Sequence, residues 1–379
     1  DFEMAYEIDF IGVNSEKSTK DADAICMRWR SGVSFDGTAT YKIGVVDGGF
    51  EAHGDALVAH MNQYYFNDEL NIKDITEKSV DFIVITHPDQ DHTKVLENFS
   101  VKKIYMNRPW KYVDDLFDKI NDGRITKESL ARRLREKYKT IADIEDMAKE
   151  KNIPIYEAFE GTHIEDELLI LSPEKQYYLS LLVSSEKTPL EMSSALQHDG
   201  TLLKFLESVK DFALNILETW DIETLRESET TSAENETSVI LRGKVDGSGF
   251  ILTGDAGIGS LNRAIDYMEK IGENIVEDIS FYQVPHHGGR HNVSPSVLNR
   301  MLGEKIEKGS SRNKVAFASV AQNSSHPLKM VTNAYIRRGV TIYKTNGNVI
   351  CHHNGKMPDR RWVGLKSIEF SDYVEEWSN

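Results

Sequence analysis

The chain has 379 residues, of which 45 are basic and 61 acidic, and its formal net charge is −16. This negative charge repels phosphate backbones at long range and argues against a non-specific coat on nucleic acid. Its apolar runs are too short for a membrane span, no basic and apolar leader opens it, and Cys26 and Cys351 form no C-x-x-C pair, so we expect a cytoplasmic protein with buried free thiols.

Short apolar runs rich in β-branched residues recur along the chain and predict strands. Central runs such as "DFIVIT" and "FILTG" are apolar on both alternations, which is typical of a sheet covered by helices on both faces. We therefore predict a layered α/β fold in one domain over residues 1–379. The predicted strands lie at 5–13, 24–29, 41–49, 80–86, 102–107, 167–173, 237–243, 249–257, 279–287, 314–321 and 340–345.

Two helical insertions interrupt these strands. The first, at about 110–150, carries apolar residues at helical spacing among many charges. The second, at about 186–225, opens with the cap "TPLE" and continues as one apolar stripe over 202–220. We expect the stripe to pack on the core; the alternatives are a lid, a homodimer face or a surface for a protein partner. The acidic stretch 226–238 predicts a mobile surface loop.

The segment "THPDQDHT" places four metal-competent side chains directly after the strand predicted at 80–86. They are His87, Asp89, Asp91 and His92. Imidazole nitrogens and carboxylate oxygens suit Zn²⁺, Mn²⁺ and Fe, and a turn of this kind can supply alternate residues to two ions. The alternative is a strand-to-helix turn that Asp91 caps, with exposed histidines.

The same pattern repeats at other strand ends. Asp47, Asp255, the pair His286 and His287, and His326 each follow an apolar run. Because ligand sites in α/β proteins gather where strands end, we expect these side chains to meet in one site.

The order of these motifs resembles the metallo-β-lactamase fold superfamily, and within it the branch similar to the C-terminal domain of the competence protein ComEC. The resemblance implies a four-layer αββα sandwich with a dinuclear metal site along one edge. The superfamily signature is His-x-His-x-Asp-His, and here Asp89 stands where the second histidine is expected, a variant shared by that branch and by the phosphorylcholine esterases. The motifs are "VVDGG", "ITHPDQDH", "LLILSP", "ETSVILR", "ILTGDAG", "VPHHGG" and "SHP".

The resemblance also assigns ligands. It implies that His87 and Asp89 bind one ion, that Asp91 and His92 bind the other, and that Asp255 bridges both. A further histidine ligand of the superfamily has no clear match in this chain. One ion is therefore expected to have an open position or to be a harder ion such as Mn²⁺, so the cofactors are two divalent ions, Zn²⁺ or Mn²⁺.

The remaining candidates support these ligands or meet the substrate. His286 or His287 matches a later histidine ligand; the strand end slightly favours His286, and the other member is then free to donate a proton. The resemblance gives Asp47 an orienting role behind the ligands and makes His326 a proton donor or phosphate contact. The candidate catalytic residues are Asp91, His287 and His326.

Arg290, His291 and Ser294 follow "HHGG", where they are candidates to hold a substrate phosphate; ordinary loop roles are the alternative. A water shared by two ions is acidic enough to act as a nucleophile near neutral pH. We therefore expect a phosphodiesterase or nuclease acting on a phosphodiester or nucleic acid. The alternatives are an ester, lactone or phosphorylcholine esterase, and a non-catalytic interaction module with structural metals.

Overall fold

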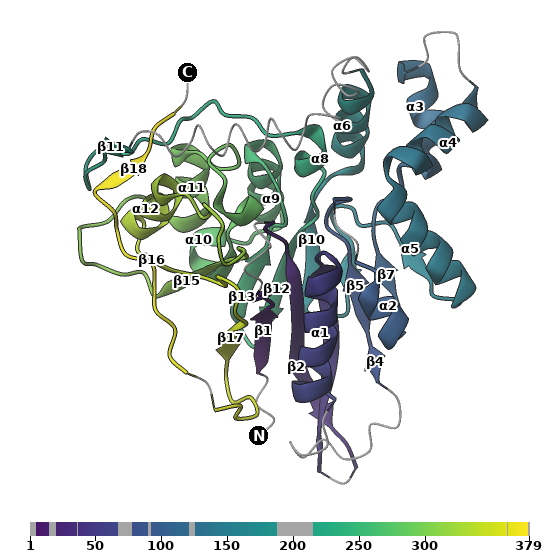
Figure 1. Cartoon of the computed structure of the whole chain (residues 1–379), viewed down its shortest axis with the longest axis horizontal. Coiled ribbons are helices and arrows are strands. Elements are labelled where there is room, and N and C mark those ends of the chain that lie inside the picture. The colour runs from purple at the N-terminus through teal and green to yellow at the C-terminus, as the bar shows by residue number, and fades with distance from the viewer. Residues whose placement is uncertain are drawn as a thin grey trace.

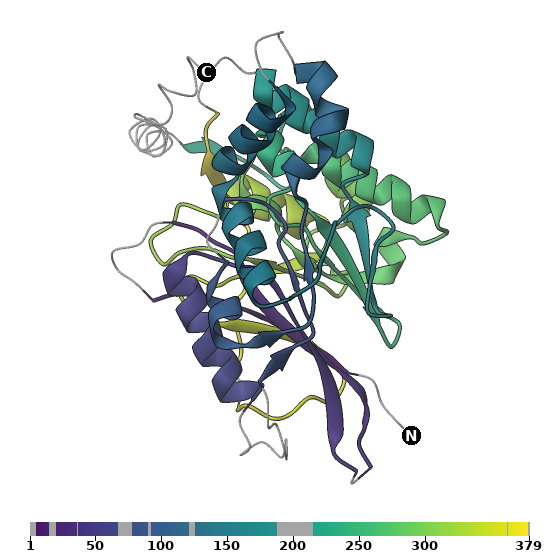
Figure 2. The same ribbon diagram turned by 90° about the vertical axis from the view of Figure 1, so that its right-hand side faces the viewer.

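The computed structural model describes residues 5–14, 20–35, 37–66, 78–89, 92–120, 126–187, 215–361 and 363–377. Two seven-stranded sheets pack face to face, and helices cover both outer faces. Figure 1 shows α1, α2 and α5 on one side of the sheets and α9 to α12 on the other, and Figure 2 shows the sheets between these helix layers.

The first sheet has the order β17-β1-β2-β3-β5-β7-β8. Strands β17, β1, β2 and β3 pair antiparallel, and β3, β5, β7 and β8 pair parallel. Its strands are β17 (Ile350–Asn354), β1 (Tyr6–Phe10), β2 (Ala24–Val33), β3 (Ala39–Gly48), β5 (Phe82–Val84), β7 (Ile104–Tyr105) and β8 (Ile155–Tyr156).

The second sheet has the order β16-β15-β14-β13-β12-β10-β9, parallel from β16 to β13 and antiparallel from β13 to β9. Its strands are β16 (Val340–Lys344), β15 (Lys314–Ala318), β14 (Ile279–Gln283), β13 (Ser248–Leu252), β12 (Ile240–Val245), β10 (Leu168–Ser172) and β9 (His163–Ile164). Two small sheets pair β11 (Asn215–Leu217) with β18 (Tyr373–Glu375) and β4 (Ser79–Val80) with β6 (Ser100–Val101).

The helices fall into an N-terminal and a C-terminal set. The first set is α1 (Glu51–Tyr64), α2 (Lys94–Asn98), η2 (Pro109–Tyr112), α3 (Val113–Ile120), α4 (Lys127–Lys137), α5 (Lys139–Glu150) and α6 (Lys175–Lys187). The second set is α8 (Ala233–Glu236), α9 (Ile258–Lys270), α10 (Ile275–Asp278), η3 (Pro285–Gly288), α11 (Pro295–Leu302) and α12 (Lys329–Arg337). Within the described ranges, no helix has the length and apolarity needed to cross a bilayer.

Successive side chains of a strand point to opposite faces of its sheet, and this alternation produces three separate apolar cores. In β1 and β2, residues such as Phe10 and Met27 point into the core between the sheets, whereas Cys26 points toward the helices of the first sheet. In β13, Phe250 faces the other sheet and Ile251 faces the helices of the second sheet. Burial on both faces of each sheet explains the continuous apolar runs, and it confirms the predicted αββα layering.

The first helical insertion is confirmed, since α3, α4 and α5 lie within 110–150. Most of the second insertion, at 188–214, lies outside the described residues. Its predicted C-terminal part is wrong, because residues 215–217 form the strand β11 and not a helix. That strand pairs with β18, which lies far along the chain, and this long-range pairing overrides the helical periodicity. The acidic stretch 226–238, predicted to be a mobile surface loop, contains α8 and contacts the site described next: the Ser238 hydroxyl accepts from the Asp255 N–H at 3.2 Å.

Candidate metal centre

Several of the predicted ligands, among them His87, Asp255 and His287, lie together because several strands end at one edge of the two sheets. Strands β3 and β5 are parallel neighbours, as are β13 and β14, so the segments that follow each pair emerge together. Antiparallel pairing of Ala24 with Gly48 also brings the start of β2 to the end of β3. The site therefore receives side chains from the beginning of one strand as well as from the ends of others.

A hydrogen-bonded chain fixes the orientation of the His87 ring. The buried Asp47 accepts hydrogen bonds from the Thr86 backbone N–H (2.8 Å) and from the Thr86 hydroxyl (2.5 Å). Because the hydroxyl has donated its only proton, its oxygen accepts from His87 Nδ1 at 2.7 Å. His87 Nε2 then faces Asp255 Oδ2 at 3.6 Å. Asp47 is thus linked to His87 through Thr86, and its role of orienting a metal ligand stays a prediction.

Asp255 lies at the centre of three imidazoles. Its Oδ2 is 3.0 Å from His286 Nδ1 and faces His87, whereas its Oδ1 is 3.8 Å from His287 Nε2. Burial opposes ionisation of this carboxyl, but the three histidines outweigh burial and hold its pKa far below the usual range. The two oxygens of Asp255 face different partners, which is the arrangement of a carboxylate that bridges two positions.

Left-handed backbone conformations at "HHG" place the side chains of the neighbouring residues His286 and His287 differently. His286 and His287 have φ values of 46° and 59°, within the short helix η3. His287 is buried, and its ring lies with Asp255 and Asp23 in a group whose ligand atoms are all within 4.8 Å of one another. His286 is 34% exposed and hydrogen-bonds Asp255. The buried ligand cluster therefore contains His287, although the strand end had slightly favoured His286.

Asp23 was missed by the sequence reading. It is 1% exposed and immediately precedes β2. The predicted ligands all follow strands, whereas Asp23 precedes an antiparallel strand that begins at the same edge. The pairing of "DADAICMRW" with the strand ending in "DGG" is the signal that identifies it.

The other predicted ligands of the turn at 87–92 are not brought to Asp255 in the same way. Gly48 N–H donates to His92 Nδ1 (2.8 Å), so the ring proton of His92 lies on the buried Nε2. Burial lowers the pKa of His92 to about 3, which keeps the ring neutral, and ligation through Nε2 requires this hydrogen bond to break. Asp89 is exposed, and Asp91 lies outside the described residues. Their ligand roles remain predictions.

Buried polar atoms without partners test whether a metal fits. Among the described residues, no hydrogen-bond partner is present for Asp23 Oδ2, His87 Nε2, His92 Nε2, Asp255 Oδ1 and His287 Nδ1. Leaving such atoms unpaired is costly, and oxygen and imidazole nitrogen are the donors that Zn²⁺ and Mn²⁺ take. Burial lowers the pKa of His87, but Asp255 and Asp47 raise it to about 9, so the site attracts positive charge. A divalent cation fits the group Asp23, Asp255 and His287, and His87 faces Asp255 Oδ2 at 3.6 Å.

His326 lies at the rim of the centre on a carboxylate support. Its Nδ1 is 2.9 Å from Asp21 Oδ2, and Asp21 also accepts from Ser324 Oγ (2.7 Å) and from the Ala321 N–H (2.8 Å). The following turn is joined to "HHG", because Leu328 N–H donates to the Gly288 carbonyl at 3.2 Å. The sequence reading missed Asp21, which precedes Asp23 by two residues.

The three candidates for phosphate binding all have partners within the chain. Arg290 donates to the Glu376 carbonyl (2.9 Å) and lies over the Trp377 ring. The His291 ring pairs with Glu229 (2.7 Å), and Ser294 caps α11 by accepting from Val297 N–H. These contacts favour the alternative of ordinary loop roles, and a substrate role for these three residues stays a prediction.

Comparison with known proteins adds little to this geometry. The chain matches no family model and no curated protein. A candidate metallo-beta-lactamase from Thermotoga maritima shares 8% identity at a TM-score of 0.30, over 72% of this chain and 93% of that one. A beta-lactamase domain protein from Burkholderia ambifaria shares 10% identity at a TM-score of 0.28, over 72% and 64% of the two chains. The site is therefore interpreted from its own atoms.

Proposed function

We propose that the chain is a dinuclear metal-dependent hydrolase that cleaves phosphodiesters. The observation that carries the proposal is the convergence of three histidine rings on the buried Asp255, where His87 Nε2 and Asp255 Oδ1 have no hydrogen-bond partner among the described residues. His87 and the partly exposed His286 lie toward one oxygen, and His287 lies toward the other. Site and architecture together correspond to a sandwich hydrolase with metals held between strand ends.

The side chains around Asp255 have separable roles. Paired divalent ions at such a site supply a water acidic enough to attack an ester and positive charge to stabilise the transition state. Thr86 and Asp47 hold the ring of His87, and Asp255 keeps its negative charge between the histidines. His326, with Nδ1 toward Asp21, leaves Nε2 as the atom that would donate a proton to the leaving oxygen.

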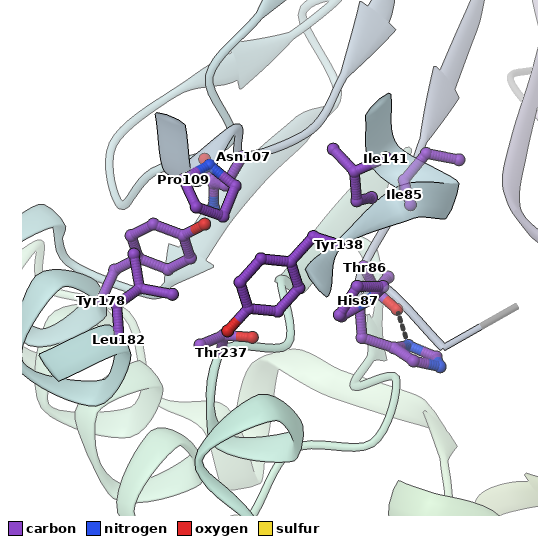
Figure 3. Close-up of a pocket in the computed structure, with 11 residues that line it drawn as sticks. Ile85, Thr86, His87, Asn107, Pro109, Tyr138, Ile141, Tyr178, Leu182 and Thr237 are labelled. Carbon is purple, nitrogen blue, oxygen red and sulfur yellow. Dashed lines mark hydrogen bonds between the residues drawn. The ribbon is translucent and has the colours of Figure 1, made fainter. Parts of the chain in front are cut away.

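Hydrolysis of a carboxylic ester or lactone is the second candidate. The observation in its favour is a small pocket beside His87 (Figure 3), which is lined largely by aliphatic and aromatic side chains and, among the described residues, by no lysine, arginine, aspartate or glutamate. Neutral substrates of this kind also avoid repulsion by the net charge of −16. Paired metals suit phosphodiesters better because two positive centres offset the charge of the phosphoryl oxygens.

One set of assays separates these functions. The protein loaded with Zn²⁺ or Mn²⁺ is incubated with bis-p-nitrophenyl phosphate, a p-nitrophenyl carboxylic ester and plasmid DNA, and its bound metal is measured by elemental analysis. We expect two metal equivalents, phosphodiester cleavage, and loss of both in Asp255→Ala. Asp166→Ala, which removes an exposed carboxylate, is the matched control.

The outcomes are distinct. Cleavage of the carboxylic ester alone supports the second candidate. Absence of bound metal and of all cleavage contradicts the hydrolase proposal and leaves an interaction module. Activity that survives in Asp255→Ala would show that the active site does not include Asp255.

A further inference from the structure

The turn that carries Asp255 is buried, and it lies between the end of β13 and the start of α9. Its neighbours Thr253 and Ala256 are fully buried, and Ala256 N–H donates to the Thr253 carbonyl at 3.2 Å. Buried backbone groups are almost always paired. The other N–H and carbonyl groups of this turn therefore need partners from elsewhere in the chain.

Side chains from two other segments pair the N–H groups of the turn. Gln283 Oε1, at the end of β14, accepts from the N–H groups of Thr253 (2.8 Å) and Gly254 (3.1 Å). The Ser238 hydroxyl, just before β12, accepts from Asp255 N–H at 3.2 Å. The turn is thus tied to the two strands on either side of β13.

The carbonyl groups of the turn are paired by the segment that carries the candidate ligand His287. Asn292 Nδ2 donates to the carbonyls of Asp255 (2.9 Å) and Ala256 (3.2 Å), and His286 N–H donates to the Gly254 carbonyl at 3.1 Å. Asn292 lies between η3, which contains His287, and α11. Its amide therefore sets how the segment with Asp255 lies against the segment with His287.

We call Ser238, Gln283 and Asn292 the turn support. All three are at most 1% exposed. Asn292 is itself held in place, because Arg290 before it donates to a backbone carbonyl and Ser294 after it caps α11. The support is consequently a fixed part of the fold.

The turn support holds Asp255 from both sides of its α-carbon. Ser238 pairs its N–H, and Asn292 pairs its carbonyl. The side chain therefore leaves the backbone in one direction, with Oδ2 toward His87 at 3.6 Å and Oδ1 toward His287 at 3.8 Å. A bridging carboxylate needs this orientation, because each oxygen has to face a different ion.

We propose that the turn support consists of positioning residues, which hold Asp255 so that one of its oxygens faces each of two metal ions. The inference rests on the proposed dinuclear hydrolase and goes beyond it, because none of the three residues is a candidate ligand or substrate contact. Binding of the second ion depends on them, since a rotated Asp255 can still serve one ion but cannot bridge two.

Replacement of Asn292 tests the proposal. Asn292→Leu keeps the branched shape of the side chain but removes its amide, and we expect it to weaken binding of the second Mn²⁺ about 10- to 100-fold in a titration against a chelator. Electron paramagnetic resonance distinguishes an exchange-coupled pair of Mn²⁺ ions, which lie about 3.5–4 Å apart, from isolated ions. At two equivalents the parent should show the coupled pair, and Asn292→Leu should show isolated ions.

A matched control separates positioning from stability. Asn333 is as buried as Asn292, and its amide also donates twice, to the Ser371 carbonyl (2.8 Å) and to Glu218 (2.9 Å), but it lies on α12. Asn333→Leu should destabilise the fold and keep the coupled pair. Ser238→Ala removes one acceptor and no carbon, and should weaken the second ion about 3- to 10-fold, the effect of one ordinary hydrogen bond.

The outcomes are separable from those of the hydrolase proposal. A coupled pair and unchanged affinity in both Asn292→Leu and Ser238→Ala overturn the positioning proposal while the hydrolase stands. Loss of the pair in Asn333→Leu as well overturns it too, because general loosening of the fold would then be the cause. A parent protein that binds Mn²⁺ without a coupled pair contradicts the dinuclear site itself, and the positioning proposal falls with it.

Discussion

A single hydroxyl group, that of Thr86, orients the ring of His87. It donates to Asp47 and accepts from the His87 ring, so the orientation of the candidate ligand His87 depends on Thr86, which is not itself a predicted ligand. Groups that orient a metal-bound histidine in this way commonly affect metal affinity by about 10- to 100-fold.

We therefore expect Thr86→Val, which keeps the shape but removes the hydroxyl, to lower affinity for Zn²⁺ or Mn²⁺ about 10- to 100-fold. Titration against a chelator of known affinity measures the change. Thr93→Val, on the same turn but hydrogen-bonded to Glu97, is the control and should keep its affinity. Equal affinities of Thr86→Val and the parent would show that the ring is held by its packing alone.

A second single-residue effect concerns the buried face of β17. The His352 ring stacks on Phe281, with a centroid distance of 4.2 Å, and lies 3.3 Å from the Tyr6 hydroxyl. Burial, reinforced by repulsion from His353, lowers the pKa of His352 to about 4. Since the unfolded chain binds this proton at an ordinary pKa of about 6.5, the stability that neutral His352 allows is present above pH 6.5 and lost as the pH falls toward 4.

Replacing His352 with Gln should therefore make the free energy of unfolding fall less steeply between pH 6.5 and 4, as measured by urea unfolding at several pH values. His163→Gln, at an exposed position on β9, should follow the parent. Parallel curves for all three proteins would mean that the ring is protonated in the folded chain.

Most residues of the candidate metal centre could be predicted from the sequence. The residues whose position depends on the pairing of strands could not. Asp47, His87 and Asp255 were found because each directly follows an apolar run. Asp23 was missed because its place at the site comes from the register between β2 and β3. The choice between His286 and His287 depends on two left-handed residues in succession, which no residue pattern in "PHHGG" predicts.

At the scale of elements, α12 is fastened to the segment after β11 by a buried ion pair. Arg337 Nη1 lies 2.8 Å from Glu218 Oε1, and both side chains are fully buried. Arg337 also donates to the backbone carbonyls of Thr219, Trp220 and Ile222. One arginine thus satisfies three backbone carbonyls of a turn that belongs to no helix or strand.

Arg337→Met should destabilise the protein by about 3–5 kcal/mol, because it leaves Glu218 buried without its cation. Arg300→Met is the comparison, since Arg300 pairs with the exposed Asp266 and should cost about 0–1 kcal/mol. Chemical denaturation measures both values. A cost for Arg337→Met as small as that for Arg300→Met would mean that water reaches Glu218 in the folded chain.

The same region explains why the end of the second insertion was predicted wrongly. Ile216 and Leu217 continue the apolar stripe of 202–220, yet they form a strand with Tyr373 and Val374. A helical period is a local property, whereas strand pairing depends on a partner that can be far away in the sequence. The first insertion has no such partner among its described residues, and its helices follow their periodicity.

At the scale of the whole molecule, the layering could be predicted and the strand order could not. Apolar runs on both alternations predict sheets covered on both faces, and three separate cores result. The pairing of β17, from the C-terminal part of the chain, with β1 could not be predicted from the sequence, because both strands are short and carry no motif that identifies their partner. It also brings Arg360 against Asp9 at 3.0 Å, inside the layer beneath α1.

Metal should stabilise the whole fold, because Asp23, His287 and Asp255 come from three distant segments. At a free metal concentration about 100 times the Kd, binding adds about 2.7 kcal/mol to the free energy of unfolding. Removal of metal should therefore lower Tm, as calorimetry with and without chelator would show. Asp255→Ala should show no difference between the two conditions; a Tm drop of equal size would place the stabilising ion elsewhere.

The pairing of Tyr6 with Asn354 has a consequence for synthesis. While the chain is still being translated, β1 can pair with β2 on one side only, and its other edge stays open until residues 350–354 have left the ribosome. Open strand edges recruit other chains. Ribosome-bound nascent chains whose residues 350–354 are still inside the exit tunnel should therefore need chaperones more than the released chain.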